Sequence, residues 1–425
     1  MTLLLIFVSL LFMYSLVSRR LERTVITAPI VFTLVGVITG SSVPASQQGG
    51  ISPDVFLRLA EIGLVLLLFA DASRTDLNVL RSIRNLPVRL LSTGMLLTII
   101  LGAIAAQFVF PTLSIWEAGI LAAILAPTDA GLGQIIVNSP HAPLRIRQAL
   151  NVEAGLNDGL SVPFLLFFMA LAAGSVAGHD ASLTRFLVEQ LGFGALLGVG
   201  IGLVGGCLLG VASRKEWATE TFQQIGVLAL PVLCLMLSEA IGASMFIAAF
   251  VAGLAVQVGF KKVSEHSVEF SEQWGQLINL FVFFLFGFLV ARGWQQFTTA
   301  SMLYGVLSIT VVRMLPVAIA LIGAGLSRAS VVFMGWFGPR GLASIVLGLV
   351  YLEQETHLPG EPLIRVAVMS TVLLSIFAHG LSAMPGVNLY ERKIASPRRR
   401  CPGTCGVQVS QEMRLIVRAD EALDV

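Results

Sequence analysis

Long, predominantly apolar runs fill most of this sequence, and they leave the chain few folds to adopt. Residues 87–108, 185–212 and 298–323 are three of these runs. About 18 apolar residues in a row form an α-helix that can cross a bilayer core of about 30 Å. Lipid offers the backbone no hydrogen-bond partners, so each run must satisfy its own amides and carbonyls as a helix. We therefore expect an all-α membrane protein.

The runs follow one another through short connections and predict about thirteen transmembrane helices. They cover residues 2–18, 25–43, 55–71, 87–108, 114–137, 146–173, 185–212, 222–239, 242–258, 270–291, 298–323, 330–352 and 363–384. No connection is long enough to hold a second folded domain. We assign residues 1–390 to one transmembrane domain and residues 391–425 to a short cytoplasmic tail, which we expect to be disordered.

The positive charges predict how the chain is oriented, because Lys and Arg gather in the cytoplasmic loops of membrane proteins. If the N-terminus lies outside, every inside connection carries at least one of them. These inside charges are Arg19, Arg20, Arg23, Arg74, Arg81, Arg84, Arg89, Arg145, Arg147, Arg214, Lys215, Lys261, Lys262 and Arg328. The outside connections hold little more than Arg58, Arg185, Arg292 and Arg365. We predict a multi-pass protein of the cell (inner) membrane with a cytoplasmic C-terminus.

Two runs are interrupted near their middles by a proline. Residues 126–129 read Ala-Pro-Thr-Asp, and residues 338–341 read Gly-Pro-Arg-Gly. Proline removes a backbone donor and clashes with the preceding turn, so it breaks or kinks a helix. The two runs are seven apart in order and must run in opposite directions, as in two inverted six-helix repeats around a linking helix. Paired interrupted helices of this kind mark transporter substrate sites; the alternative is a simple kink in each packed helix.

Several ionisable residues fall deep inside the runs, some roughly 15 Å from the nearer end. They are Asp129, Glu153, Asp158, Arg313 and Arg340. A charge at that depth is costly and marks a functional site. Three acids and two bases leave one negative charge, which one monovalent cation or one proton would neutralise. Asp71, near the inner end of its run, adds another acid if it reaches the same cavity.

The segment 151–159 separates its polar side chains between two helix faces. Glu153 and Asn157 are four residues apart and share a face, whereas Asp158 is turned away by about 100°. Glu153 can pair with Arg313 on another helix, which leaves Asp158 without an obligatory cation. Burial disfavours the charged carboxylate, so a proton and a metal cation can compete for it. The alternative is that Asp158 is a structural, hydrogen-bonded acid.

Hard monovalent cations prefer oxygen ligands. Asp129, Asp158, the Asn157 amide and a carbonyl near Thr128 could supply them. The segment 194–206 also carries a glycine at every fourth position, which lets helices approach closely. This strip is either a dimer face or a packing face within the bundle.

Together these motifs resemble the electroneutral sodium/proton exchangers of the cation:proton antiporter superfamily. The resemblance rests on Ala-Pro-Thr-Asp at 126–129, Glu-x-x-x-Asn-Asp-Gly at 153–159, Arg313 before Pro316, and Gly-Pro-Arg-Gly-Leu-Ala-Ser at 338–344. Residues 66–71 and 244–253 look like the family too. The resemblance covers nearly all of residues 1–390.

The resemblance implies a fold and a set of roles for these residues. The expected fold has thirteen helices in inverted six-helix repeats, with two crossed, broken helices, in a homodimer whose core domain moves against a dimerisation domain. Asp158 and Asp129 would bind Na⁺, K⁺ or a proton, Thr128 and Asn157 would support the broken helices, and Glu153–Arg313 would be a structural ion pair. Arg340 and Asp71 would be accessory. Ala154 departs from the family, which often has a serine there whose hydroxyl contributes to ion binding.

The expected function is a secondary antiporter that exchanges a monovalent cation, Na⁺ or K⁺, for H⁺, one for one, by alternating access. The Asn-Asp pair at 157–158, in place of the Asp-Asp of electrogenic relatives, implies this stoichiometry. A cation channel or a regulated K⁺ efflux pathway is the alternative. We expect no enzyme activity, no cofactor and no nucleic-acid partner, since the basic residues lie where membrane topology requires them.

Overall fold

A computed structural model describes residues 2–21, 24–42, 53–73, 85–129, 132, 143–174, 183–260, 265–353 and 358–399. Every regular element in these ranges is a helix. In chain order they are α1 (Thr2–Leu21), α2 (Ala28–Ser42), α3 (Pro53–Ser73), α5 (Asn85–Arg89), η2 (Leu90–Gly94), α6 (Met95–Val109), α7 (Ile115–Ile124), α9 (Leu144–Ala172), α10 (Leu183–Arg214), α11 (Glu220–Ile241), α12 (Met245–Gly259), α13 (Glu265–Gly293), η3 (Trp294–Gln296), α14 (Thr299–Ile309), α15 (Val311–Ala320), α16 (Arg328–Trp336), α17 (Leu342–Glu353) and α18 (Glu361–Arg399).

Each apolar run of the sequence contains at least one of these helices. Within the described ranges, 8 helices are long and apolar enough to cross a membrane, and four shorter apolar helices accompany them. Two of the shorter ones, α7 and α17, adjoin the interruptions that the prolines predict. The all-helical membrane fold expected from the sequence is therefore confirmed.

Three details differ from the expected boundaries. The run at 298–323 is interrupted at Thr310, whose φ of −107° and ψ of −93° separate α14 from α15. A π-helical turn, Leu90–Gly94, lies between α5 and α6. The last helix continues to Arg399, past the expected end of the transmembrane domain at residue 390, and residues 400–425 lie outside the described residues.

The glycine strip of α10 packs inside the bundle. A methyl group at Gly202 would come within 2.5 Å of the Ala252 carbonyl oxygen, and Gly206 faces Val256 in the same way. The glycines therefore let α10 and α12 run in parallel at close range. Bulky side chains such as Leu196 and Leu208 on α10 are exposed, as lipid-facing side chains are. Of the two alternatives for the strip, packing within the bundle accounts for these contacts.

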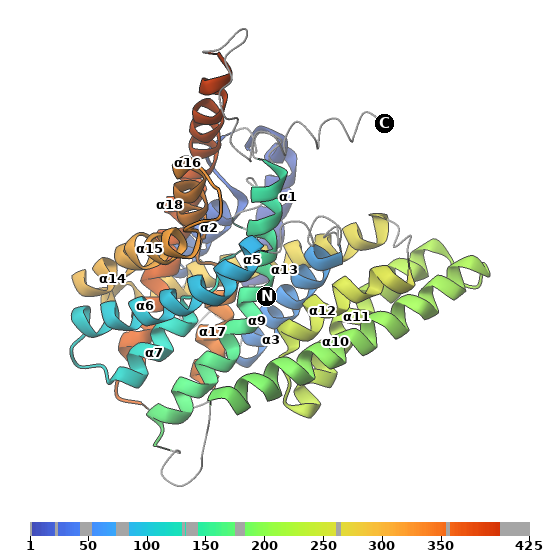
Figure 1. Cartoon of the computed structure of the whole chain (residues 1–425), viewed down its shortest axis with the longest axis horizontal. Helices are drawn as coiled ribbons and strands as arrows, with labels where there is room; N and C mark the ends of the chain where they lie inside the picture. Colours follow the sequence, from blue (N-terminus) through green and yellow to red (C-terminus); the bar gives the residue numbers. More distant parts are fainter. Residues whose placement is uncertain are drawn as a thin grey trace.

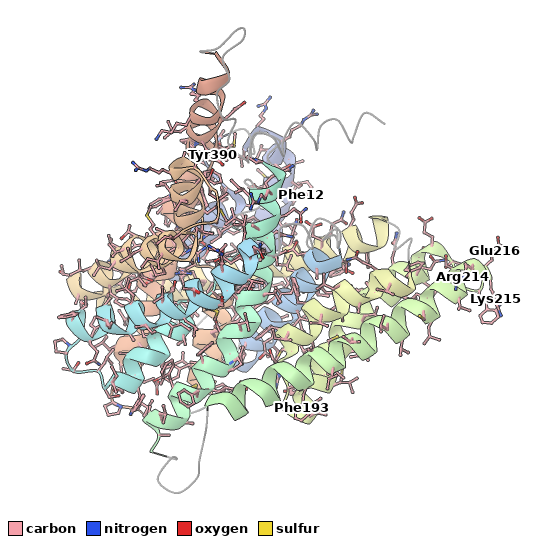
Figure 2. The ribbon with its side chains drawn as sticks, in the orientation of Figure 1. Phe12, Phe193, Arg214, Lys215, Glu216 and Tyr390 are labelled. Atoms are coloured by element: carbon pink, nitrogen blue, oxygen red, sulfur yellow. The ribbon has the colours of Figure 1, made fainter. Side chains whose placement is uncertain are left out.

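The helices form two groups joined in the middle. In Figure 1, α10 and α11 lie at one end of the molecule and α6, α7 and α14 at the other. The helices α3, α9 and α17 lie between them and contact one another. Figure 2 shows Arg214, Lys215 and Glu216 together at the end of α10, at the turn into α11. Asn157 and Asp158, two of the residues predicted to bind an ion, thus come from a helix at the centre of the molecule, α9.

Candidate ion-binding site at the two interrupted helices

The first interruption follows α7. A capping box starts this helix: the Ser114 hydroxyl accepts from the Glu117 amide, and the Glu117 carboxylate accepts from the Ser114 amide. The helix ends at Ile124, and residues 127–129 have no regular structure. Ten helical residues span about 15 Å, so the chain loses its helical form about halfway across a bilayer core.

The second interruption lies between α16 and α17. The nine residues of α16 end at Trp336, residues 338–341 are irregular, and α17 starts at Leu342. Pro339 cannot donate a backbone hydrogen bond, which explains why the helix does not continue. Both interruptions that the sequence predicts are therefore present.

The two interruptions bond directly to each other. The Asp129 amide donates to the Pro339 carbonyl over 2.8 Å. The Leu342 amide donates to Asp129 Oδ2 over 2.6 Å. In the other direction, Arg340 Nη1 donates to the carbonyls of Ala126 and Pro127 over 2.6 and 2.9 Å. Two segments more than 200 residues apart in the sequence thus supply hydrogen-bond partners for each other's backbone groups at the interruptions.

Charge complements the helix ends at these contacts. A helix has a partial positive charge at its N-terminus and a partial negative charge at its C-terminus. The Asp129 carboxylate lies at the N-terminus of α17, and the Arg340 guanidinium lies at the carbonyl end of α7. Gly341 is needed here, because a Cβ at this position would lie 2.8 Å from Asp129 Cγ and even nearer to Oδ2.

The helix α9 supplies the polar residues beside the interruptions. Asn157 Nδ2 donates to Thr128 Oγ1 over 2.8 Å. One turn earlier, Glu153 Oε1 lies 2.6 Å from Arg313 Nη1 of α15, and each of these side chains is 3% exposed. Glu153 and Asn157 therefore point toward the group that contains α7 and α15, as their shared helix face predicts.

Asp158 points to the other side of α9. Its neighbours Gly155 and Gly159 face Phe250 and Ile247 of α12. Asp158 projects about 60° from Gly155, on the side away from Gly159, and about 100° from Asn157. The residue is 4% exposed, and its Oδ1 accepts no hydrogen bond within the described part of the chain. Its charged neighbours are Asp129 and Asp71, which are close enough to act on it electrostatically.

The structure thus gathers Thr128, Asn157, Asp129 and Arg340 at the interruptions and brings Glu153 to Arg313. Asp71 lies near the C-terminal end of α3 and is partly exposed. Two residues that the sequence did not single out as polar partners of the site are Ser375 and His379 of α18, which bond to the second interruption. Serine and histidine one turn apart in an apolar helix were the signal available in the sequence.

Comparison with known proteins finds similarity over most of the chain. A family model described as "Sodium/hydrogen exchanger, transmembrane" matches residues 6–388. The chain is 26% identical over 389 residues to the K⁺/H⁺ antiporter NhaP of Alkalimonas amylolytica, across 89% of this chain. It is also 26% identical over 425 residues to a probable Na⁺/H⁺ antiporter of Schizosaccharomyces pombe, across 88% of this chain.

These relatives are longer proteins. The chain spans 65% of the Alkalimonas protein's length and 54% of the Schizosaccharomyces protein's. Among solved structures, the sodium proton antiporter MjNhaP1 from Methanocaldococcus jannaschii has a similar fold, with a TM-score of 0.69 and 19% identity. That match covers 89% of this chain and 98% of MjNhaP1.

The family match covers most of the chain, and a similar fold extends over nearly all of MjNhaP1. The chain is thus an all-helical, multi-pass membrane protein of a transporter family and not an enzyme. It belongs to the sodium/hydrogen exchanger family of transmembrane proteins.

Proposed function

We propose that this protein is a secondary antiporter that exchanges a monovalent cation, Na⁺ or K⁺, for H⁺ across the cell membrane, one for one. The relatives are named as antiporters of both cations, so the choice between Na⁺ and K⁺ is a matter for measurement.

The observation that carries the proposal is the contrast between three buried carboxylates. Glu153 is paired with Arg313, and both oxygens of Asp129 accept backbone amides, those of Leu132 and Leu342. Asp158 is equally buried, yet its Oδ1 accepts no hydrogen bond from any described residue. A buried charge without a partner costs several kcal/mol, so Asp158 requires a proton or a cation.

The charges around Asp158 make this requirement stronger. Arg313 is occupied by Glu153, and Arg340 is occupied by the carbonyl end of α7. The charged groups that act on Asp158 are two other acids, Asp129 and Asp71. A single positive charge bound at Asp158 therefore relieves repulsion as well as desolvation, and a proton and an alkali cation meet this need equally.

Oxygen ligands for the cation are at hand. Asn157 donates its amide nitrogen to Thr128, which leaves its Oδ1 without a hydrogen bond among the described residues. Asp129 holds the N-terminus of α17, so its carboxylate contributes charge at short range while its oxygens keep their backbone donors. Water completes the shell in the position that the expected serine hydroxyl would occupy beside Ala154.

Alternating access follows if only the neutralised site can cross the membrane. Loading Asp158 with either ion removes the charge penalty on the moving helices, and a ligand shifts a two-state equilibrium only by its differential affinity for the states. We assign the motion to the helices around the two interruptions, moving against α3, α10 and α12. Thirteen helices in inverted repeats, an external N-terminus, a cytoplasmic C-terminus and a homodimer complete the proposed arrangement.

Helix directions support this topology. The contacts of Gly36 with Phe284 and of Gly40 with Phe288 make α2 and α13 parallel. The contacts of Gly63 with Asn279 and of Gly275 with Leu67 make α3 and α13 antiparallel. These directions are those expected for the second, third and tenth of the predicted helices.

Exchange in proteoliposomes tests the proposal. Purified protein is reconstituted with a pH-sensitive dye inside, and an outward gradient of Na⁺ or K⁺ is imposed. We expect proton uptake in the wild type, none in Asp158→Asn, and normal exchange in the control Glu220→Gln, an exposed acid at the start of α11. Normal exchange in Asp158→Asn would exclude Asp158 as the carrier.

The same vesicles distinguish exchange from a channel. One-for-one exchange moves no net charge, so clamping the membrane potential with an ionophore leaves its rate unchanged. A cation channel or a regulated K⁺ efflux pathway would instead carry current that follows the potential. A potential-dependent flux without proton movement would overturn the proposal.

A further inference from the structure

Two buried polar residues of α18 lie against the second interruption. Ser375 and His379 are four residues apart and share one face of the helix. They are 0% and 1% exposed. Polar side chains at such depth need hydrogen-bond partners, and both of these find them in the backbone around the break between α16 and α17.

The contacts reach both sides of the break. On one side, the backbone amide of Arg340 donates to Ser375 Oγ over 2.6 Å. On the other, His379 Nε2 lies 2.9 Å from the carbonyl oxygen of Trp336, the last residue of α16. His379 Nδ1 lies 3.1 Å from Ser375 Oγ, so the two side chains are also joined to each other.

The direction of each hydrogen bond follows from the partners. The Trp336 carbonyl can only accept, so Nε2 of His379 carries the hydrogen. His379 Nδ1 also lies 3.0 Å from the Ser375 carbonyl oxygen. In the neutral tautomer whose hydrogen is on Nε2, Nδ1 is an acceptor and the Ser375 hydroxyl donates to it. The same oxygen accepts the Arg340 amide. One continuous series of hydrogen bonds therefore runs from Arg340 through Ser375 and His379 to Trp336.

This series replaces bonds that the broken helix lacks. The last four carbonyls of a helix have no partner within the helix. The Trp336 carbonyl is among them, and it accepts from the Gly338 amide over 2.9 Å as well as from His379. The Arg340 amide lies in an irregular segment and has no helical acceptor. Holding the Arg340 amide in place also holds the Arg340 Cα, from which the side chain extends. The guanidinium of this side chain donates to the Ala126 and Pro127 carbonyls. The position of one interruption thereby determines the position of the other.

We propose that His379 and Ser375 form a clasp that holds the second interruption, and through Arg340 the cation site, in binding geometry. They are positioning residues, since neither contacts the carboxylate of Asp158 in any described interaction. The proposal rests on the exchange function proposed above.

The test compares variants of the clasp with a control on the same helix. His379→Leu and Ser375→Ala remove members of the clasp. His379→Gln keeps an amide that can donate to Trp336 and accept from Ser375. Ser382→Ala is the control, because Ser382 accepts from the Trp336 indole over 2.9 Å and does not bond the backbone of the break.

Two measurements are made on each variant. The first is hydrogen–deuterium exchange of the segment 336–341, which does not depend on transport and separates failure of the clasp from failure of the proposed function. We expect faster exchange in His379→Leu and Ser375→Ala, and wild-type exchange in Ser382→Ala. Unchanged exchange in both clasp variants would overturn the proposal.

The second measurement is cation-driven proton transport. His379→Leu removes one hydrogen bond from the buried Trp336 carbonyl, which keeps the Gly338 amide, and such a loss changes an equilibrium constant by up to about ten-fold. We expect the KM for the cation to rise about that much in His379→Leu, with a smaller change in kcat, and to return toward wild type in His379→Gln. Equal impairment of the Leu and Gln variants would show that packing volume, not hydrogen bonding, is what His379 provides. If His379→Leu does not fold, the other two variants still test the proposal. We expect Ser375→Ala to exchange deuterium faster and to have a raised KM, and His379→Gln to stay near wild type in both assays.

Discussion

Removing one member of the Glu153–Arg313 pair should cost far more stability than removing both. The two charged atoms lie 2.6 Å apart, and each side chain is 3% exposed. Removing one partner leaves the other charge buried and uncompensated, which costs about 3–5 kcal/mol. Glu153 Oε2 and Arg313 Nε and Nη2 have no further hydrogen-bond partners among the described residues. Replacing both residues with apolar ones therefore removes the ion pair but no other hydrogen bond of these atoms.

The chain contains a matched control for this experiment. Arg58 Nη2 lies 2.6 Å from Glu239 Oε1, the same separation, but these side chains are 46% and 47% exposed. An exposed pair contributes about 0–1 kcal/mol. If the distance between the charges alone mattered, the two pairs would contribute equally to the free energy of unfolding. Because one pair is buried and the other exposed, we expect their contributions to differ several-fold.

Unfolding in mixed micelles measures the effect. We expect Glu153→Met and Arg313→Met each to lower the free energy of unfolding by about 3–5 kcal/mol, and the double variant by about 1 kcal/mol or less. Glu239→Met should change it by at most about 1 kcal/mol, because Glu239 is exposed and Arg58 keeps its second partner, Glu61. Additive losses in the double variant would refute the reasoning, because they would mean that each side chain contributes through packing rather than through its partner.

Two glycine substitutions test the close contacts of the fold. Gly341→Ala places a methyl group against the Asp129 carboxylate and should displace this carboxylate from the Leu342 amide. Losing that charged hydrogen bond costs about 1.5–3 kcal/mol and should lower the transport rate at least about ten-fold. A wild-type rate would contradict this account of the second interruption. Gly202→Val forces a side chain against α12 and should destabilise the protein by about 1–3 kcal/mol. Gly200→Val, where nothing lies within 4 Å, should leave the melting temperature unchanged, and equal losses in the two valine variants would show that the strip does not pack.

Much of the architecture could be predicted from local patterns. Apolar length predicts helices because lipid leaves the backbone no other choice, and Pro127 and Pro339 mark the two interruptions because proline cannot continue a helix. The shared face of Glu153 and Asn157 follows from helical periodicity alone. Each of these inferences depends only on residues a few positions apart.

The partners of the interruptions could not be predicted in this way. The oxygens of Asp129, which we propose as part of the ion site, also accept two backbone amides that local patterns did not indicate, one of them from Leu342, 213 residues away. The role of His379 could not be predicted from the sequence, because its partner Trp336 is 43 residues away and offers a carbonyl that every residue has. The interruption at Thr310 has no glycine or proline at that position. Long-range contacts decide these details, and a single sequence carries little trace of them.

The central claim is that one carboxylate carries either the cation or the proton. Adding Na⁺ or K⁺ to purified protein in weakly buffered detergent solution, with choline as the control salt, tests it directly. Linkage requires that a cation which displaces a proton releases it, so we expect about one proton per bound cation in the wild type and none in Asp158→Asn. Proton release from Asp158→Asn equal to that of the wild type would contradict the account.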